Sequence, residues 1–294
     1  MIKVDGRLQE GEILSGHTSF RIGGPADLFA VPDTLEEAVR IAALCARESV
    51  PCHVLGGGTN ILVSDKGVRG VVMDLTLLSG LRADDTLVTA LGGTPVSALA
   101  EFALARGLAG MEFAYALPGS VGGAVWMNAR CYEREISDVL EFVDYLDADN
   151  GEQRLPMRRD EWHYKVSPFQ RMRGVILQAG FRLAPGSPRQ IEDLMQEHRQ
   201  DRERKGHFLF PCAGSVFKNN RAFGAPTGVI VDSLGLKGRR IGGAQVAPFH
   251  GNIIVNTGGA TARDVLSLIE LVEDEVQRRR GFPLEREVLL VGDW

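Results

Sequence analysis

The sequence of 294 residues has only four cysteines, no apolar run of membrane-spanning length and no excess of basic residues. Cys45, Cys52, Cys131 and Cys212 form no Cys-x-x-Cys pair, so a zinc site is not indicated, and reduced thiols are typical of a cytosolic protein. A membrane span needs about 18 apolar residues in succession. The formal net charge of −5 leaves no surplus of positive charge for nucleic-acid phosphates. We therefore expect no metal, nucleic-acid or membrane partner.

The N-terminal residues 1–6 contain no apolar signal region, which favours a cytoplasmic location. Hydrophobic residues make up 44% and charged residues 24% of the chain, as in a soluble globular protein. At about 100–200 residues per domain, the length suggests two domains. The clearest linker signal is Ala-Pro-Gly-Ser-Pro at 184–188. We therefore predict domains 1–187, with lobes of about 1–78 and 79–187, and 188–294.

Helix and strand signals alternate along the chain and predict an α+β fold. One helix is expected to run to about Glu48, with Asp33 and Thr34 as its candidate caps. Another is expected after Thr94 as its cap, with Pro95 at its first position. The glycine-rich stretch 110–128 is expected to be a long structured loop. The expected strands are 52–55, 69–75, 86–91, 139–147, 175–183 and 287–291.

Two further helices are expected in the C-terminal part of the chain. The first carries Ile191, Leu194, Met195 and His198 on one face. The last begins at Thr261, with an acid three residues later, and is stopped by a glycine and a proline at 281 and 283. Its apolar stripe is Val265, Leu268, Ile269, Val272 and Val276.

A glycine cluster directly follows the strand expected at 52–55. It consists of Gly56, Gly57, Gly58, Thr59 and Asn60. Consecutive backbone amides in such a turn can converge on a phosphate, and glycine lets a ligand approach closely. The cluster is neither a Walker loop nor a Rossmann fingerprint, because the required lysine and third glycine are missing. Taken alone, it is equally compatible with a turn that binds nothing.

A second loop of small residues favours the ligand-binding interpretation. Its candidate cofactor-binding residues are Pro118, Gly119, Ser120, Gly122 and Gly123. Further glycine pairs stand at 23–24 and 92–93. Several loops at which backbone can approach a ligand are typical of a site for one long molecule, and a dinucleotide is the obvious candidate.

These motifs resemble those of the UDP-N-acetylenolpyruvoylglucosamine reductase family in its short form, within the flavoproteins of the vanillyl-alcohol-oxidase type. Their order and spacing are together highly specific, and they span residues from about 17 to 292. The matching segments are 18–26, 55–60, 117–123, 128–129, 214–219, 235–238, 250 with 252, and 284–288.

The resemblance implies a two-lobed FAD-binding module followed by an α+β substrate-binding domain. It implies non-covalent FAD that is reduced by NADPH. The implied reaction turns UDP-N-acetylglucosamine enolpyruvate into UDP-N-acetylmuramate for peptidoglycan, and so serves cell wall biogenesis, cell shape and cell division. The partners are then the small UDP-sugar enolpyruvyl ether and NADPH, and we expect a monomer.

The resemblance also implies roles for individual residues. Ser215 matches the proton donor, although alone it is better interpreted as a turn hydroxyl that bonds its own backbone. Glu287 matches the catalytic glutamate, and it must either carry a proton or orient a donor. Glu285 competes with it, because residues two apart on a strand share a face. Lys218 and Asn219 match substrate-binding positions.

One position departs from the family. Lys165 follows Tyr164 where the family has arginine, so the positive charge stays but the planar, two-pronged guanidinium is lost. The resemblance assigns Lys165 to the substrate carboxylate and Tyr164 to substrate binding, while Arg171 or Arg173 remain alternatives. The departure also permits a second hypothesis, a flavin- or nucleotide-sugar-binding homologue with little or no activity. A third hypothesis is an FAD-linked oxidase of small alcohols.

Overall fold

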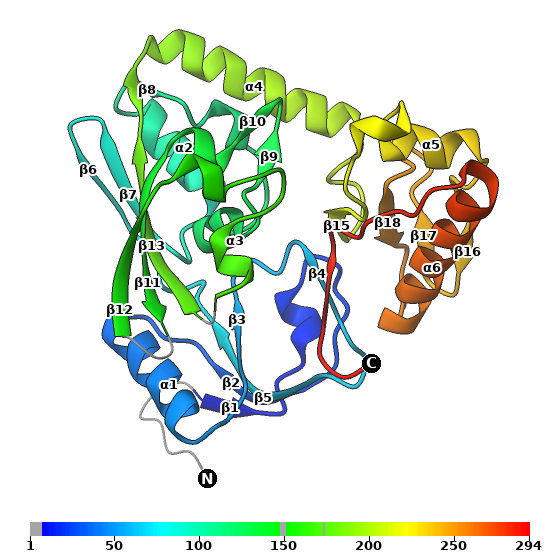
Figure 1. Ribbon diagram of the computed structural model, residues 1–294, viewed down its shortest axis with the longest axis horizontal. Helices are drawn as coiled ribbons and strands as arrows, with labels where there is room; N and C mark the ends of the chain where they lie inside the picture. Colours follow the sequence, from blue (N-terminus) through cyan, green and yellow to red (C-terminus); the bar gives the residue numbers. More distant parts are fainter. Residues whose placement is uncertain (1–7, 148–150, 173) are drawn as a thin grey trace. The chain divides into compact units, whose positions relative to one another are not determined.

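The computed structural model describes residues 8–147, 151–172 and 174–294. Its contacts divide the chain into two compact units. The first unit contains the chain up to residue 10 with 28–57 and 70–201, and the second contains 11–27, 58–69 and 202–294. Figure 1 labels the helices and strands of both. The predicted domains, 1–187 and 188–294, stay a prediction, and residues 1–6 lie outside the described residues.

A five-stranded antiparallel sheet in the order β12-β11-β13-β7-β6 forms the centre of the first unit (Figure 1). The short helix α3 (Val121–Trp126) packs against β7 and β13, and α2 (Val96–Leu104) packs against α3. The strands predicted at 86–91, 139–147 and 175–183 are confirmed. The strands of this sheet are β6 (Leu81–Asp84), β7 (Leu87–Leu91), β11 (Leu140–Asp147), β12 (Gly151–Pro156) and β13 (Gly174–Arg182).

The predicted cap of α2 is wrong, although the helix itself is confirmed. Pro95, with φ −58° and ψ 135°, stands at the N-cap, and no side chain caps this helix. The Thr94 hydroxyl instead donates to the Gly80 carbonyl at 3.1 Å and accepts from the Gly80 amide at 3.0 Å. A contact with a distant turn therefore replaces the local cap that the sequence suggests.

The prediction of one long loop over 110–128 is also wrong. A 3-10 turn forms at Glu112–Ala114, and α3 forms at Val121–Trp126. Ser120 is the N-cap of α3, and its hydroxyl accepts from the Gly123 amide at 3.3 Å. Two glycines disfavour this helix intrinsically, so its packing against the sheet must outweigh their low helix propensity.

A smaller group of elements completes the core of the first unit. Helix α1 (Leu35–Arg47) is capped by Thr34, whose hydroxyl accepts from the Glu37 amide at 3.2 Å, and it buries Ala38, Ile41 and Cys45. The strands predicted at 52–55 and 69–75 are confirmed. The strands here are β1 (Leu8–Glu10), antiparallel to β2 (Ala26–Ala30), and β3 (Cys52–Leu55), parallel to β5 (Val68–Asp74).

The predicted linker is followed by the long helix α4 (Pro188–Arg204). Two linker residues form β14 (Ala184–Pro185), which pairs with β8 (Leu108–Ala109). On α4, Ile191, Met195 and His198 are buried, whereas Leu194, predicted for the same face, is 40% exposed. Leu194 lies at the edge of the buried stripe, where helical spacing alone leaves burial undecided.

The second unit contains a four-stranded antiparallel sheet in the order β15-β18-β17-β16, with α6 (Ala262–Arg280) packed on β16 and β17 (Figure 1). Strand β4 (Ile61–Val63) pairs in parallel with β19 (Leu289–Val291), so the last strand begins two residues later than predicted. The other elements of this unit are β15 (Cys212–Ser215), β16 (Arg240–Ile241), β17 (Ala244–Val246), β18 (Ile253–Asn256) and α5 (Thr227–Ser233).

Helix α6 forms as its sequence predicts. The Thr261 hydroxyl accepts from the Asp264 amide, and the Asp264 carboxylate accepts from the Thr261 amide, both at 3.0 Å. The bond from the Thr261 backbone is the main reason why the pKa of Asp264 lies below its ordinary value. Gly281 ends the helix with φ +83°. All five residues of the predicted stripe are buried.

The remaining elements are short. None of the helices within the described ranges is long and apolar enough to cross a membrane, and these ranges hold no group of three or more His, Cys, Asp or Glu side chains placed to bind a metal ion. The short elements are β9 (Arg130–Cys131), β10 (Arg134–Glu135) and the 3-10 turns Leu14–His17, Ile136–Asp138, Arg159–Glu161, Pro168–Gln170 and Arg221–Phe223.

Candidate functional site

In the first unit, the two predicted cofactor loops lie against each other. A Cβ atom added to Gly56 would come within 2.2 Å of the Ser120 hydroxyl oxygen, and one added to Gly57 within 2.8 Å of the Gly119 Cα atom. Real Cβ atoms do not approach other atoms so closely, so position 57, which faces backbone, requires glycine, whereas a side chain at position 56 would have to displace the Ser120 hydroxyl. Loops far apart in sequence, 56–57 and 118–123, thus form one local structure.

The backbone of these loops fits a phosphate ligand. Within the part of the chain that the structure describes, the amides of Gly57 and Gly119 donate no hydrogen bond to the protein. Such amides are suited to a pyrophosphate, because a bound ligand displaces the water at each amide and its phosphate oxygens can accept the hydrogen bond in place of that water. Gly122 differs, because its amide donates to the Gly92 carbonyl at 2.7 Å.

The rest of the first glycine loop belongs to the second unit. Gly58 has φ +59° and its carbonyl accepts from the Ser19 amide at 3.0 Å. The side chain of Asn60 donates to the Glu287 carbonyl at 3.0 Å, and the Asn60 carbonyl accepts from the Leu289 amide at 3.0 Å. Asn60 therefore ties the loop to the segment that carries the predicted catalytic glutamate, a role that the sequence did not indicate.

In the second unit, residues 216–218, which directly follow Ser215, pair with residues 285–288. Phe217 forms a bridge with Arg286, the Lys218 amide donates to the Glu285 carbonyl at 2.8 Å, and the Glu287 amide donates to the Val216 carbonyl at 2.7 Å. The structure therefore brings the predicted residues Ser215, Lys218 and Glu287 together on neighbouring segments, although about 70 residues separate them in sequence.

Ser215 ends strand β15 and is partly exposed. Its hydroxyl forms no hydrogen bond with any residue that the structure describes, and Gly214 before it has φ +70°. The interpretation as a turn hydroxyl bonded to its own backbone is therefore wrong. The hydroxyl is available to a substrate.

The two candidate glutamates differ sharply in exposure. Glu287 is 7% exposed, whereas the side chain of Glu285 is 72% exposed and pairs with the Lys218 ammonium at 2.6 Å. A buried carboxyl group is the better candidate for a catalytic role, because the protein determines its environment, whereas an exposed one is screened by water. Burial thus favours Glu287 over Glu285.

Lys218 and Asn219 are held by a threonine at the start of α5. The fully buried Thr227 donates from its hydroxyl to the Lys218 carbonyl at 2.9 Å, and its amide donates to the Asn219 side-chain oxygen at 2.8 Å. Asn219 is exposed. The Asn219 side chain thus has a structural bond in addition to its predicted contact with substrate.

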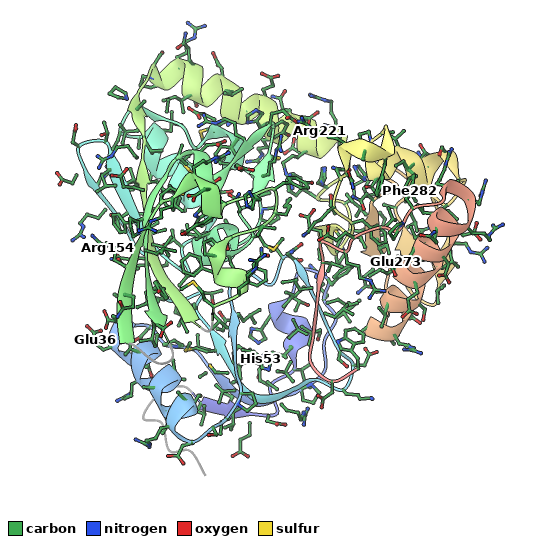
Figure 2. All side chains as sticks on the ribbon, viewed as in Figure 1. Glu36, His53, Arg154, Arg221, Glu273 and Phe282 are labelled. Carbon is green, nitrogen blue, oxygen red and sulfur yellow. The ribbon has the colours of Figure 1, made fainter. Side chains whose placement is uncertain are left out.

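The glutamate segment is also anchored to α6. Arg286 makes two hydrogen bonds of 2.6 Å with the carboxylate of Glu273, which Figure 2 labels on this helix. That carboxylate raises the pKa of the Arg286 guanidinium. Because Arg286 is next to Glu287 in the chain, the ion pair limits the positions that Glu287 can take.

The segment with Ser215 has an anchor of its own. Asn252 is 2% exposed, and its side chain accepts from the Phe217 amide at 2.9 Å and donates to the Phe217 carbonyl at 2.8 Å. His250 accepts from the Asn252 amide at 3.1 Å. Burial, with the positive charges of Lys205 and Lys237, lowers the pKa of His250, which keeps this imidazole neutral.

The other predicted residues, Tyr164 and Lys165, stand at the corner of a tight turn in the first unit. His163 and Val166 bond to each other through both backbone groups, at 3.0 and 3.1 Å, and Lys165 has φ +59°. The Arg130 guanidinium lies 5.5 Å from the centre of the Tyr164 ring. Of the two alternatives to Lys165, Arg171 is exposed, and Arg173 lies outside the described residues.

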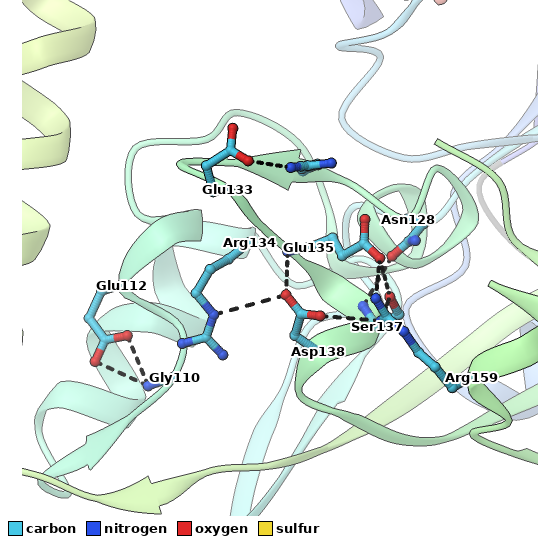
Figure 3. Close-up of polar contacts among 10 residues, drawn as sticks. Gly110, Glu112, Asn128, Glu133, Arg134, Glu135, Ser137, Asp138 and Arg159 are labelled. Atoms are coloured by element: carbon cyan, nitrogen blue, oxygen red, sulfur yellow. Dashed lines mark hydrogen bonds and ion pairs between the residues drawn. The ribbon is translucent and has the colours of Figure 1, made fainter. Parts of the chain in front are cut away.

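An open hollow of about 470 Å³ borders this turn. Figure 3 shows the ion pairs on one side, where Arg159 contacts Glu135 at 3.0 Å, Asp138 at 3.2 Å and the Ser137 hydroxyl at 2.7 Å. These bonds connect the chain just before the turn to residues 135–138. The lining residues are Arg130, Glu133, Glu135, Asp138, Arg159, Trp162, His163 and Tyr164.

Comparison with known proteins identifies the family. Residues 26–155 match the model of an FAD binding domain, and residues 205–291 match that of the C-terminal domain of UDP-N-acetylenolpyruvoylglucosamine reductase. The reductase of that name from Treponema denticola is 42% identical over 97% of this chain and 95% of its own length. The one from Caldanaerobacter subterraneus is 40% identical over 98% of this chain and 95% of its own. The chain belongs to the UDP-N-acetylenolpyruvoylglucosamine reductase family.

Solved structures agree with this assignment. The crystal structure of the reductase from Thermus caldophilus matches with a TM-score of 0.81 at 33% identity, over 97% of this chain and 99% of that one. Cholesterol oxidase from B. sterolicum matches 63% of this chain with a TM-score of 0.50 at 14% identity, which shows a shared fold alone. The predicted family, the FAD-binding fold and the prediction of an FAD-dependent reductase are confirmed.

Proposed function

We propose that this chain reduces UDP-N-acetylglucosamine enolpyruvate to UDP-N-acetylmuramate with NADPH, as a monomer in the cytoplasm. The observation that carries the proposal is the pairing of 216–218 with 285–288, the segment of a buried glutamate. Ser215 directly precedes the paired residues, and its hydroxyl bonds no residue that the structure describes. Full-length similarity to reductases of that name supports the same activity.

Five of the predicted residues, Gly57, Gly119, Lys165, Ser215 and Glu287, have a defined task in the proposed reaction. The amides of Gly57 and Gly119 would hold the pyrophosphate of FAD, which when bound and reduced by NADPH would supply hydride-transfer chemistry. Lys165 stabilises the negative charge that grows at the substrate carboxylate, and a preorganised donor of this kind is worth about 3–4 kcal/mol. Ser215 gives its hydroxyl proton to the carbon next to the carboxylate, and Glu287 orients this proton donor.

The first test replaces the proposed proton donor. Ser215→Ala should lower kcat by about 100-fold or more, because a positioned proton donor contributes about 10²–10⁴-fold. The flavin content should stay unchanged, since Ser215 lies outside the glycine loops. NADPH oxidation on addition of the sugar nucleotide measures kcat. A variant that turns over like the unaltered protein would rule out this role.

The second test uses the two glutamates as a matched pair. Glu287→Gln and Glu285→Gln make the same chemical change two residues apart, at a buried and an exposed position. We expect Glu287→Gln to reduce kcat by about 100-fold or more, and Glu285→Gln to change it by less than about threefold, because the exposed ion pair is screened. The reverse order would transfer the role to Glu285.

A second candidate function follows from the lysine at the arginine position. The chain would then bind flavin or a nucleotide sugar with little or no reductase activity, because lysine cannot grip a carboxylate with two parallel bonds. Lys165→Arg separates the two functions. A modest change in kcat indicates a working enzyme, whereas turnover that appears only in this variant indicates a binding protein. The match to the reductase C-terminal domain disfavours an oxidase of small alcohols.

A further inference from the structure

We propose that Asn128 is a positioning residue for Lys165, which it serves by fixing the two-residue turn of Tyr164 and Lys165. This inference rests on the proposed role of Lys165 and adds to it a residue that does not itself touch substrate. It follows from a set of side-chain bonds between the turn and residues 126–128 at the end of α3. Figure 3 labels Asn128 and Ser137, which Asn128 also contacts.

The Asn128 side chain is fully buried, at 0% exposure, and both of its polar atoms are used. Its nitrogen donates to the His163 carbonyl at 2.9 Å, and its oxygen accepts from the Ser137 amide at 3.0 Å. The same His163 carbonyl accepts from the Val166 amide, which closes the turn. Asn128 therefore holds the carbonyl at which the turn begins.

A second side chain holds the other end of the turn. The Gln170 side chain donates to the Lys165 carbonyl at 2.9 Å and to the Trp126 carbonyl at 3.0 Å. The Ser167 hydroxyl donates to the same Trp126 carbonyl at 2.6 Å. Both ends of the turn are thus bonded to residues 126–128, which directly follow or end α3.

The turn needs these bonds because its backbone is unfavourable. Lys165 has φ +59°, a backbone conformation that residues other than glycine rarely adopt. Such a residue keeps this conformation only when its surroundings impose it, and these positions concentrate at functional sites. Asn128 itself has φ +42°, which asparagine tolerates better than most residues. A lysine fixed in this way presents its ammonium group from one defined place.

The test removes the side chain of Asn128 without forbidding its backbone conformation. Asn128→Gly should lower kcat by about 10- to 100-fold, because a misplacement of about 1 Å can reduce turnover by as much as 10²-fold. The flavin content should not change. In a chain that already carries Lys165→Met, the same substitution should lower kcat by less than about twofold more, because residues that act through one another are not additive.

A second readout does not depend on activity. Hydrogen exchange at the Val166 amide should become at least about tenfold faster in Asn128→Gly, since the bond that protects it loses its support. Gln170→Met should have the same effect with little risk to folding, because methionine keeps the volume and removes the donor. The control is Asn256→Gly. Asn256 is 8% exposed and donates to the Phe20 carbonyl at 3.0 Å in the second unit, so exchange at Val166 should stay unchanged.

The outcomes separate this inference from the proposed function. Unchanged exchange at Val166 in Asn128→Gly and Gln170→Met would overturn the inference, whatever the activity. So would full additivity of Asn128→Gly with Lys165→Met. If Lys165→Met itself turned over normally, the proposed role of Lys165 would fail, and with it the positioning role, while faster exchange would still show that Asn128 holds the turn.

Discussion

Gly58 offers the most quantitative test of the cofactor loop, because two separate penalties act on any side chain placed there. Its φ of +59° is costly for a residue with a Cβ atom, by about 1–2 kcal/mol. The added Cβ would also lie 2.2 Å from the His17 carbonyl oxygen and 2.9 Å from the Thr18 Cα atom. Both are backbone atoms, so relief requires movement of the chain, and overpacking of this kind costs about 1–3 kcal/mol.

The two penalties predict a loss of about 1–5 kcal/mol in the free energy of unfolding for Gly58→Ala, after subtraction of the roughly 0.4–1 kcal/mol that a less flexible unfolded chain contributes. Urea unfolding followed by circular dichroism measures this loss, and flavin fluorescence measures the affinity for FAD. We expect the affinity to fall as well, because the loop can accept the methyl group only by moving.

Two other glycines of the same unit provide matched controls. Gly11 has φ +68° with nothing within 4 Å of its added Cβ, so Gly11→Ala should lose about 1 kcal/mol from the backbone term alone. Gly16 has open space and no left-handed φ, so Gly16→Ala should lose nothing and gain up to about 1 kcal/mol. If Gly58→Ala were no less stable than Gly11→Ala, the steric argument for this loop would be refuted.

Three further predictions concern the second unit. A double-mutant cycle of Glu273→Gln and Arg286→Gln, measured by urea unfolding, should give a coupling energy of about 1–2 kcal/mol, and each variant should have a lower kcat. A coupling energy near zero would show that the ion pair does not anchor the glutamate segment. Because the pKa of Asp264 is lower in the folded protein, this carboxylate adds stability above its unfolded pKa of about 3.9, and this stability is lost as the pH falls through the folded pKa. The free energies of unfolding of Asp264→Asn and of the unaltered protein should therefore converge as the pH falls through that range. Thr227→Val keeps the shape of the side chain but removes the hydroxyl that donates to the Lys218 carbonyl. The free energy of unfolding should fall by about 1–3 kcal/mol, and the KM for the sugar nucleotide should rise. An unchanged KM would show that this threonine does not support substrate binding.

Several features of the fold were predictable because their causes are local in sequence. Helix α6 has its capping box, its apolar stripe and its terminal glycine within one continuous segment, so spacing alone predicts it. The same holds for α1 and for the strands with alternating apolar residues. The family was predictable for a different reason: many short motifs in one order leave few other interpretations.

The wrong or missing predictions concern features whose causes lie in contacts with residues distant in sequence. Thr94 bonds to Gly80 instead of capping α2, and α3 forms despite two glycines, because contacts with distant residues outweigh local preference. Asn60 donates to the carbonyl of Glu287, 227 residues away, and Gln170 donates to that of Trp126, 44 residues away, and no local pattern points to either carbonyl. A hydrogen bond to a backbone carbonyl leaves little trace in the composition of the partner segment.

The sequence by itself determined the residue types available for chemistry: the glycines of two loops, a serine, two glutamates and a lysine in place of arginine. Only the tertiary structure decided which glutamate is buried, since Glu285 and Glu287 stand on one segment with nearly the same neighbours. It also decided that the residues directly after Ser215 pair with that segment and that Asn128 bonds to the turn of Lys165. Burial and hydrogen bonding depend on which segments contact each other, and the packing of the whole chain determines those contacts.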